Sequence, residues 1–312
     1  MIALNHKLFT NSLITLNQRS KSINNYIKLD AMKKILVPID FSKNAIDALS
    51  YAIDFEKDQK VKFFILHAVT PVLVQSPQGA TVSAIMTQNL VDEAKVKMKD
   101  LKNKMVKIFS ANNESQFEIK TMVQIGNASR EILEQVKELE IDLLIMGTKG
   151  AGHDNLDRIF GTISSSMLND VKCPMILVPK GYIFKEIDNV IFSTDLDKSD
   201  SFELWKGYKV LSPHNPMIRV LHVKKQKDKQ DEKQLKAFAD HLIDSSPAIK
   251  TQFNIEIGDR PEEYIEKYAI SHHAEMILMP KRRKNIFQRL LNPSRTKKVL
   301  NTLTSIPIMI LN

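Results

Sequence analysis

An internal repeat constrains this 312-residue chain more than any other feature of its sequence. The apolar run at residues 35–40, which ends in Asp40, returns 155 positions later at residues 190–195. A second run returns at the same offset, at residues 219–223. Three later runs return 132 or 133 positions on, at residues 255–258, 275–279 and 306–310. Five matches in the same order predict a tandem duplication with a shorter middle in the second copy.

Each copy alternates continuous apolar runs with stretches of helical periodicity. Continuous runs are typical of strands that are buried on both faces, as in a parallel sheet covered by helices. We therefore predict two tandem α/β domains, at residues 32–180 and 181–312, each a doubly wound, five-stranded, Rossmann-like parallel sheet. Ligands of such sheets bind beyond the carboxyl ends of the strands, near the switch in strand order. Asp40, Ala68 and Gly147 lie at such ends.

Four helices are expected in the first copy. Ser42 can cap the first, and Asn127 opens the third. The predicted inward face of the second helix comprises Leu90, Ala94, Met98, Leu101, Met105 and Ile108. That of the fourth helix comprises Ile163, Met167, Leu168 and Val171.

Composition excludes several classes of protein. The one cysteine, Cys173, rules out an intrachain disulfide framework and a multi-thiolate metal site, and we interpret it as a buried structural thiol. No apolar run approaches the roughly 18 residues of a membrane span. Residues 1–31, rich in Asn and Ser, predict a disordered or loosely docked extension, with a weak amphipathic targeting helix as the alternative.

The surplus positive charge is local. The net charge is +9, and residues 276–312 carry eight basic residues and no acid. Aromatic side chains do not alternate with these basic ones, because Phe287 stands alone among them, so a nucleic-acid partner is not expected.

Glycines follow the apolar run that ends at Met146. The segment Gly147-Thr148-Lys149-Gly150 begins this glycine-rich stretch, and Gly161-Thr162-Ile163-Ser164 stands at the head of the fourth helix. Glycine lets backbone N–H groups approach a phosphate, and a helix N-terminus adds partial positive charge. The pattern predicts a phosphate site, with ordinary tight turns as the alternative.

These residues resemble the universal stress protein family, within the adenine-nucleotide α-hydrolase-like superfamily. The resemblance covers both copies and rests on residues 35–42, 66–68, 145–150 and 160–162. ATP-binding members of the family carry Gly-x2-Gly-x9-Gly-(Ser/Thr). This chain has Gly147-x2-Gly150, and then ten residues before Gly161-Thr162.

The resemblance implies a site for ATP or a related adenine nucleotide, with or without Mg²⁺, in a cytoplasmic protein. Asp40 would meet the ribose or adenine, although a helix-start carboxylate is the plainer interpretation. The backbone of Ala68 would meet adenine, and Met146 and Gly147 would line the base and ribose. The implied phosphate ligands are Gly150, Gly161, Thr162, Ile163 and Ser164.

The second copy departs from this pattern. Pro280-Lys281-Arg282-Arg283 replaces residues 147–150, and Ser294-Arg295 replaces residues 161–162. Side chains then occupy the space of a phosphate, and proline removes a donor. We predict that the second copy has lost nucleotide binding of the family's type. Two interpretations stay open for Lys281, Arg282, Arg283 and Arg295: a cluster that holds an anion, or a solvated basic face.

The expected function is that of a nucleotide-responsive stress factor. No residue identifies a catalytic base, so at most slow hydrolysis or autophosphorylation is expected, and no metal ligand set stands out beyond the loop residues His153, Asp154 and Asp157. The alternative is an interaction module in which the glycines are only structural. The resemblance also implies that the strands at residues 175–178 and 308–311 pair within the chain; a homodimer remains open.

Overall fold

The computed structural model describes residues 32–76, 79–111, 117–148, 162–197, 199–226, 229–245, 249–283 and 306–312. The predicted extension at residues 1–31 lies outside these ranges. Residues Lys34–Asn312 form one compact unit.

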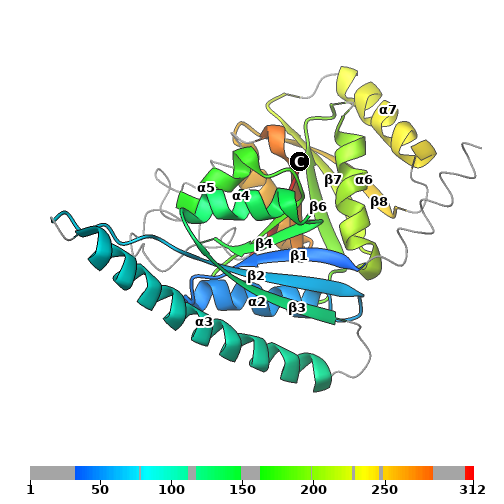
Figure 1. Ribbon diagram of the computed structural model, residues 1–312. Coiled ribbons are helices and arrows are strands. Elements are labelled where there is room, and N and C mark those ends of the chain that lie inside the picture. The colour runs from blue at the N-terminus through cyan, green and yellow to red at the C-terminus, as the bar shows by residue number, and fades with distance from the viewer. Residues whose placement is uncertain are drawn as a thin grey trace, which may run out of the picture. The chain divides into compact units, whose positions relative to one another are not determined.

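The elements of the first half alternate strands with helices (Figure 1). They are β1 (Lys33–Pro38), α2 (Lys43–Phe55), β2 (Val61–Val69), α3 (Gly79–Ala111), β3 (Phe117–Ile125), α4 (Ala128–Glu138), β4 (Leu143–Gly147), α5 (Thr162–Asp170) and β5 (Met175–Val178).

The second half repeats this alternation as far as the chain is described. Its elements are β6 (Asn189–Thr194), α6 (Asp200–Leu211), η1 (Ser212–His214), β7 (Met217–Lys224), α7 (Lys229–Ser245), β8 (Thr251–Ile257), α8 (Pro261–Ser271), β9 (Met276–Pro280), η2 (Lys281–Arg283) and β10 (Ile308–Leu311).

All ten strands join one sheet in the order β3-β2-β1-β4-β5-β10-β9-β6-β7-β8. The first five and the last five are mirror orders, as a duplication related by a pseudo-twofold axis requires. Pairing is parallel within each half and antiparallel between β5 and β10, where Ile176 lies opposite Met309. The pairing of these two last strands, expected from the sequence, is confirmed.

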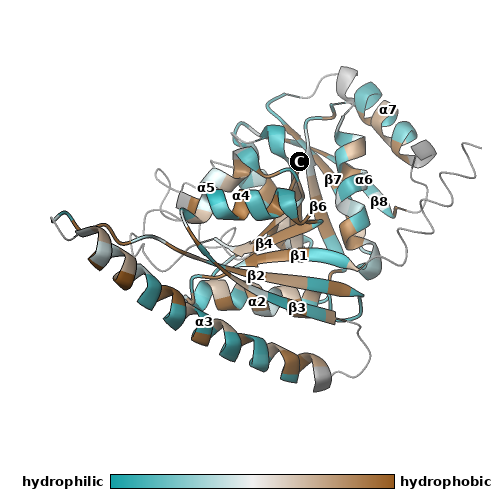
Figure 2. Cartoon of the chain, viewed as in Figure 1, coloured by the Kyte–Doolittle hydropathy of each residue, from teal (hydrophilic) through white to brown (hydrophobic). Residues whose placement is uncertain are grey.

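Two hydrophobic cores cover the two faces of the sheet. Ile35 and Val37 of β1 belong to one core, with side chains of α2, α3, α6 and α7. Leu36 belongs to the other, with side chains of α4, α5 and α8. Figure 2 shows hydrophobic colour along β4 and β6 and polar colour on the helices. The structure therefore confirms the expected strands buried on both faces.

The duplication extends to strained backbone positions. Phe41 and Leu196, which follow β1 and β6, have φ of 61° and 58°. Glu140 and His273, which precede β4 and β9, have φ of 52° and 49°. Left-handed backbone is uncommon for residues with a Cβ, so its recurrence at matching positions shows that the two copies share their turns in detail.

The segment between β5 and β6 packs across α2. Its Tyr182 and Phe184 rings lie 5.9 and 5.5 Å from the ring of Tyr51, which is 2% exposed. The backbone N–H of Gly181 donates to Asp47 at 3.0 Å. This connection therefore completes the core of the first half.

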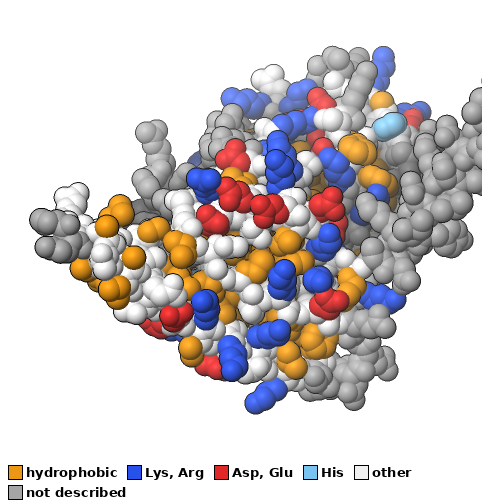
Figure 3. All heavy atoms as spheres, in the orientation of Figure 1, with side chains coloured by type: hydrophobic (Ala, Val, Ile, Leu, Met, Phe, Trp, Pro, Cys, Tyr) orange, Lys and Arg blue, Asp and Glu red, His pale blue; other side chains and the backbone are white. Residues whose placement is uncertain are grey.

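The helix α3 is longer than the predicted apolar face. Met98 and Met105 are buried as expected, whereas Leu90 and Ile108 are 42% and 47% exposed, so the prediction was wrong for these two. Further hydrophobic side chains are exposed towards the N-terminal end of α3, where Figure 3 shows hydrophobic atoms at the surface. Val91 and Phe109, which follow Leu90 and Ile108 in the helix, are 5% and 3% exposed, so the buried face lies one position away from the predicted one at both places.

The junction between β5 and β10 provides a test of the fold. Ile176→Ala and Met309→Ala each remove buried methyl groups, and each is expected to lower the free energy of unfolding by about 2 kcal/mol or more. Since the two residues are opposed, the double variant should show an interaction energy of about 0.5 kcal/mol or more in denaturant titrations. Strictly additive losses would contradict this packing, and the exposed Val96→Ala serves as the control.

Candidate functional site

The first corner of interest follows β1. The carboxylate of Asp40 accepts from the N–H of Ser42 at 2.9 Å. The hydroxyl of Ser42 in turn accepts from the N–H of Ala45 at 3.2 Å and caps α2, as the sequence predicted. Phe41, with its positive φ, makes the turn between strand and helix. These contacts hold the Asp40 carboxylate at the carboxyl end of β1.

Neighbouring strands bring the other predicted residues to the same edge. Because β1 lies between β2 and β4, Ala68 near the end of β2 and Gly147 at the end of β4 flank the turn that carries Asp40. The strand order reverses between β1 and β4, which is where ligands bind in sheets of this kind. Met146 belongs to one of the two cores, and the whole residue is 6% exposed.

Gly147 is fixed by close packing. A Cβ at this position would lie 2.5 Å from Nδ2 of Asn44 and 2.9 Å from its carbonyl oxygen. The hydroxyl of Ser164 donates to the carbonyl of Gly147 at 3.1 Å, and the N–H of Thr148 donates to Val178 at 3.0 Å. These contacts tie the start of α5 and the end of β5 to the end of β4.

Several predicted residues cannot be placed. Gly150, Gly161 and Arg295 lie outside the described residues, as do His153, Asp154 and Asp157, and of Thr162 only the backbone at the start of α5 is described. Ile163 is half-buried against the core that contains α4 and α5.

Two histidines behave as structural groups. Nδ1 of His67 lies 2.7 Å from the carbonyl of Ile39, and Nδ1 of His222 lies 2.9 Å from the carbonyl of Thr194. The contacts are equivalent in the two copies, and each links neighbouring strands. Both rings are therefore held by backbone carbonyl groups of the preceding strand segment.

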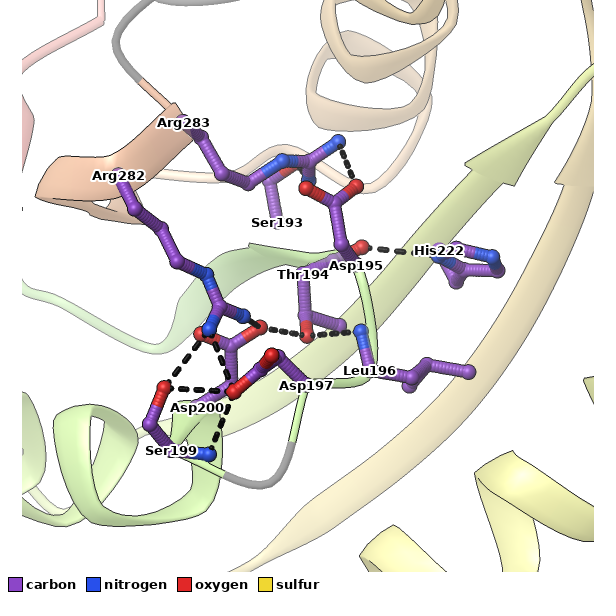
Figure 4. A network of polar contacts seen from close by, with 10 residues as sticks. All are labelled: Ser193, Thr194, Asp195, Leu196, Asp197, Ser199, Asp200, His222, Arg282 and Arg283. Atoms are coloured by element: carbon purple, nitrogen blue, oxygen red, sulfur yellow. Dashed lines mark hydrogen bonds and ion pairs between the residues drawn. The ribbon is translucent and has the colours of Figure 1, made fainter.

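The equivalent corner of the second half is filled by arginine. Arg283, at the end of η2, has a fully buried side chain whose Nη2 lies 2.9 Å from the carboxylate of Asp195. Its Nη1 donates to the hydroxyl of Ser193, which is also buried. Figure 4 shows the guanidinium pointing at Asp195, the counterpart of Asp40. Asp195 therefore has a cation of its own chain beside it.

Arg282 makes a second set of contacts at the same corner. Its guanidinium is paired with Asp197 at 2.7 Å and with the fully buried carboxylate of Asp200, and it donates to the hydroxyl of Ser199 at 2.7 Å. Asp200 also accepts from the hydroxyl of Thr194 at 2.6 Å (Figure 4). The two described arginines of the predicted anion cluster, Arg282 and Arg283, are therefore already paired with carboxylates. Nζ of Lys281 donates to the carbonyl of Val171 at 3.3 Å.

The carboxylates of this corner have shifted pKa values in opposite directions. Hydrogen bonds from the N–H and hydroxyl of Ser199, together with Arg282, lower the pKa of Asp197 to about 2. Burial raises the pKa of Asp200 above its ordinary value, although the hydrogen bond from Thr194 and the charge of Arg282 act to lower this pKa. Burial also lowers the pKa of Arg283, which Asp195 opposes. The paired Asp195 thus favours the charged form of a buried guanidinium.

Two members of this network, Asp200 and Ser193, were not indicated by the sequence analysis. Asp200 stands where the first copy has Ala45, and Ser193 stands where it has Pro38. Aligning the two copies position by position exposes both changes, but hydrophobic periodicity does not. Within the described ranges, no group of three His, Cys, Asp or Glu side chains could hold a metal ion.

The structure is a tandem, doubly wound α/β protein in which the corners after β1 and β6 differ in their side chains. Residues 32–179 match the universal stress protein family. That region therefore belongs to the universal stress protein family. None of the described helices combines the length and apolar character that a membrane crossing requires.

The curated relatives are similar to this region, and a solved structure shares the fold. A universal stress protein of Methanocaldococcus jannaschii is 26% identical over 151 residues, which is 47% of this chain and 82% of the relative. Universal stress protein A homolog 2 of Coxiella burnetii is 26% identical over 48% of this chain and 97% of its own length. A universal stress protein structure from Archaeoglobus fulgidus covers 89% of this chain and 98% of its own, with a TM-score of 0.66 and 16% identity, which shows the fold of both halves.

The Asp197 carboxylate predicts a pH dependence. A carboxyl group with a lowered pKa in the folded protein stabilises it above the unfolded pKa, near 3.9, and this contribution is lost as the pH falls through about 2. Asp197→Asn should therefore lower the thermal midpoint at pH 7, and the difference from the parent protein should shrink to nothing near pH 2. Thermal denaturation by circular dichroism at several pH values measures this, and a constant difference would contradict it.

Cys173 gives a second prediction. The residue is 7% exposed, and burial raises the pKa of its thiol to about 12. The thiolate is the reactive species, so the folded protein should react with Ellman's reagent at pH 8 at least about tenfold more slowly than the unfolded chain, whose thiol titrates near 8.5. Equal rates with and without denaturant would contradict the buried position.

Proposed function

We propose that the first copy binds ATP or a related adenine nucleotide and that the protein acts as a nucleotide-responsive stress factor. The site comprises Asp40, Ala68, and the backbone of Met146 and Gly147. Gly150, Gly161, Thr162, Ile163 and Ser164 would hold the phosphates.

One comparison within the molecule supports this proposal more than any other. In the second half, the position equivalent to Gly150 is Arg283, whose guanidinium lies against Asp195. In the first half, the same position is a glycine, which has no side chain to place beside Asp40. The first copy thus lacks the side chain that stands beside the aspartate in the second copy, and this difference in sequence supports a ligand site in the first copy.

The chemistry of the first corner suits a nucleotide. A carboxylate at the end of β1 can accept hydrogen bonds from ribose hydroxyls, and glycine backbone N–H groups can donate to phosphate oxygens. The N-terminus of α5 adds partial positive charge next to the second glycine element. A bound Mg²⁺ would neutralise part of the phosphate charge. The chain itself would bind and orient the nucleotide; no described residue is assigned a catalytic step.

Calorimetric titration of the full chain with Mg-ATP tests the proposal. We expect about one site per chain. Gly161→Arg should raise Kd at least about tenfold, equivalent to about 1.4 kcal/mol, because a side chain then occupies the phosphate position. The matched change Ser294→Arg, at the equivalent position of the second copy, should leave binding unchanged. No heat of binding from folded parent protein, or equal losses in the two variants, would refute the proposal.

A second candidate function is an interaction module that binds no nucleotide. The exposed hydrophobic side chains of α3 favour it, since Ile85 and Met86 are 57% and 45% exposed near one end of this helix. The titration separates the two functions, because an interaction module would give no nucleotide heat.

A further inference from the structure

The residues that differ between the two corners contact one another. Arg283 replaces Gly150 and donates to Ser193, which replaces Pro38. Arg282 replaces Lys149 and pairs with Asp200, which replaces Ala45. Changes that had accumulated independently on a solvated face would not be expected to meet as donor and acceptor. These four positions form one complementary set around the carboxylate that both copies share.

The burial of Arg283 makes this set interdependent. A fully buried guanidinium is costly unless an opposite charge lies beside it, and the carboxylate within 2.9 Å is Asp195. Nε and Nη2 of Arg283 have no hydrogen-bond partner among the described residues, so the contact between Nη2 and Asp195 is an ion pair. Ser193 accepts one hydrogen bond but carries no charge. The compensation of this buried charge therefore depends on Asp195.

Arg282 completes the corner at its more exposed side. Its side chain is 34% exposed, and it bridges Asp197, at the surface, to Asp200, which is fully buried (Figure 4). Two guanidinium groups thus face three carboxylates. A phosphate approaching this corner would meet cations that are already paired, with carboxylates beside them.

We propose that Arg283 is an internal ligand of the second copy: its guanidinium, held by Asp195 and Ser193, occupies the place that a nucleotide takes in the first copy. The comparison with a nucleotide rests on the proposed function. The contacts of Arg283 with Asp195 and Ser193 do not depend on that proposed function. Asp195 then has a role that requires no bound molecule, namely to compensate a buried cation.

A double-variant cycle without nucleotide tests this assignment. Asp195→Asn keeps the size of the side chain and removes its charge, so the buried Arg283 loses its counter-ion. We expect the thermal midpoint to fall by roughly 4 °C or more. In the Arg283→Met background, no buried cation remains, and the same Asp195→Asn change should lower the midpoint by less than about 2 °C.

The result that overturns the proposal is equally definite. If Asp195→Asn lowers the midpoint by the same amount in both backgrounds, then Arg283 is not held by Asp195. Titration with Mg-ATP gives an independent arm: a Gly161→Arg chain that still binds one nucleotide, and loses it on Asp195→Asn, would show that the second corner is open. Failure of the parent protein to bind Mg-ATP would refute the proposed function and leave the thermal cycle decisive for Arg283.

Discussion

The antiparallel pairing of β5 with β10 is the constraint on which the rest of this structure depends. Each half alone would be a five-stranded sheet with its last strand exposed at an edge, which is a template for unwanted pairing. Joining the two last strands removes both edges and buries Ile176 and Met309 completely. The side-chain amide of Asn312 also donates to the carbonyl of Cys173 at 2.7 Å, just before β5. The two copies therefore stabilise each other along one line of backbone contacts.

This pairing also explains how the two corners can diverge. Each corner lies at the carboxyl ends of the inner strands of its own half, β1 and β4 or β6 and β9. The junction of β5 with β10 contains neither Asp40 nor Asp195. Changes at one corner therefore need not disturb the pairing that holds the halves together. A duplicated chain can keep one corner open and fill the other without losing the common sheet.

Much of the fold could be predicted because it depends on local and periodic signals. Continuous apolar runs predicted the buried strands, and the offsets at which they return predicted the duplication. The pairing of the two last strands was implied by the family resemblance. Ser42 and Asn127 identified the starts of α2 and α4, and both side chains accept hydrogen bonds from the first turn. A cap is recognisable because its partner lies only two or three residues away.

The parts that escaped prediction depend on partners far apart in the chain. Arg283 and Ser193 are 90 positions apart, and polar residues at strand ends follow no period that reveals their partners. The packing of Tyr182 on Tyr51 escaped prediction for the same reason, because the connection that contains Tyr182 has no regular pattern of its own. Leu90 and Ile108 of α3 were mispredicted because an apolar period does not by itself decide which of two adjacent apolar residues faces the sheet, and Val91 and Phe109 are the buried ones.

The filled corner suggests why a site that loses its ligand does not simply collapse into a hydrophobic contact. A carboxylate in such a corner, once no ligand donates to it, can be replaced by another residue or can gain a new partner. In this chain the new partner is an arginine, and the arginine in turn makes the carboxylate necessary, because burying the one without the other is costly. The retained aspartate is thus no evidence that the second corner still binds a nucleotide. The carboxylate that both copies share therefore has different contacts in each: Asp195 compensates a buried arginine, and Asp40 accepts a hydrogen bond from Ser42.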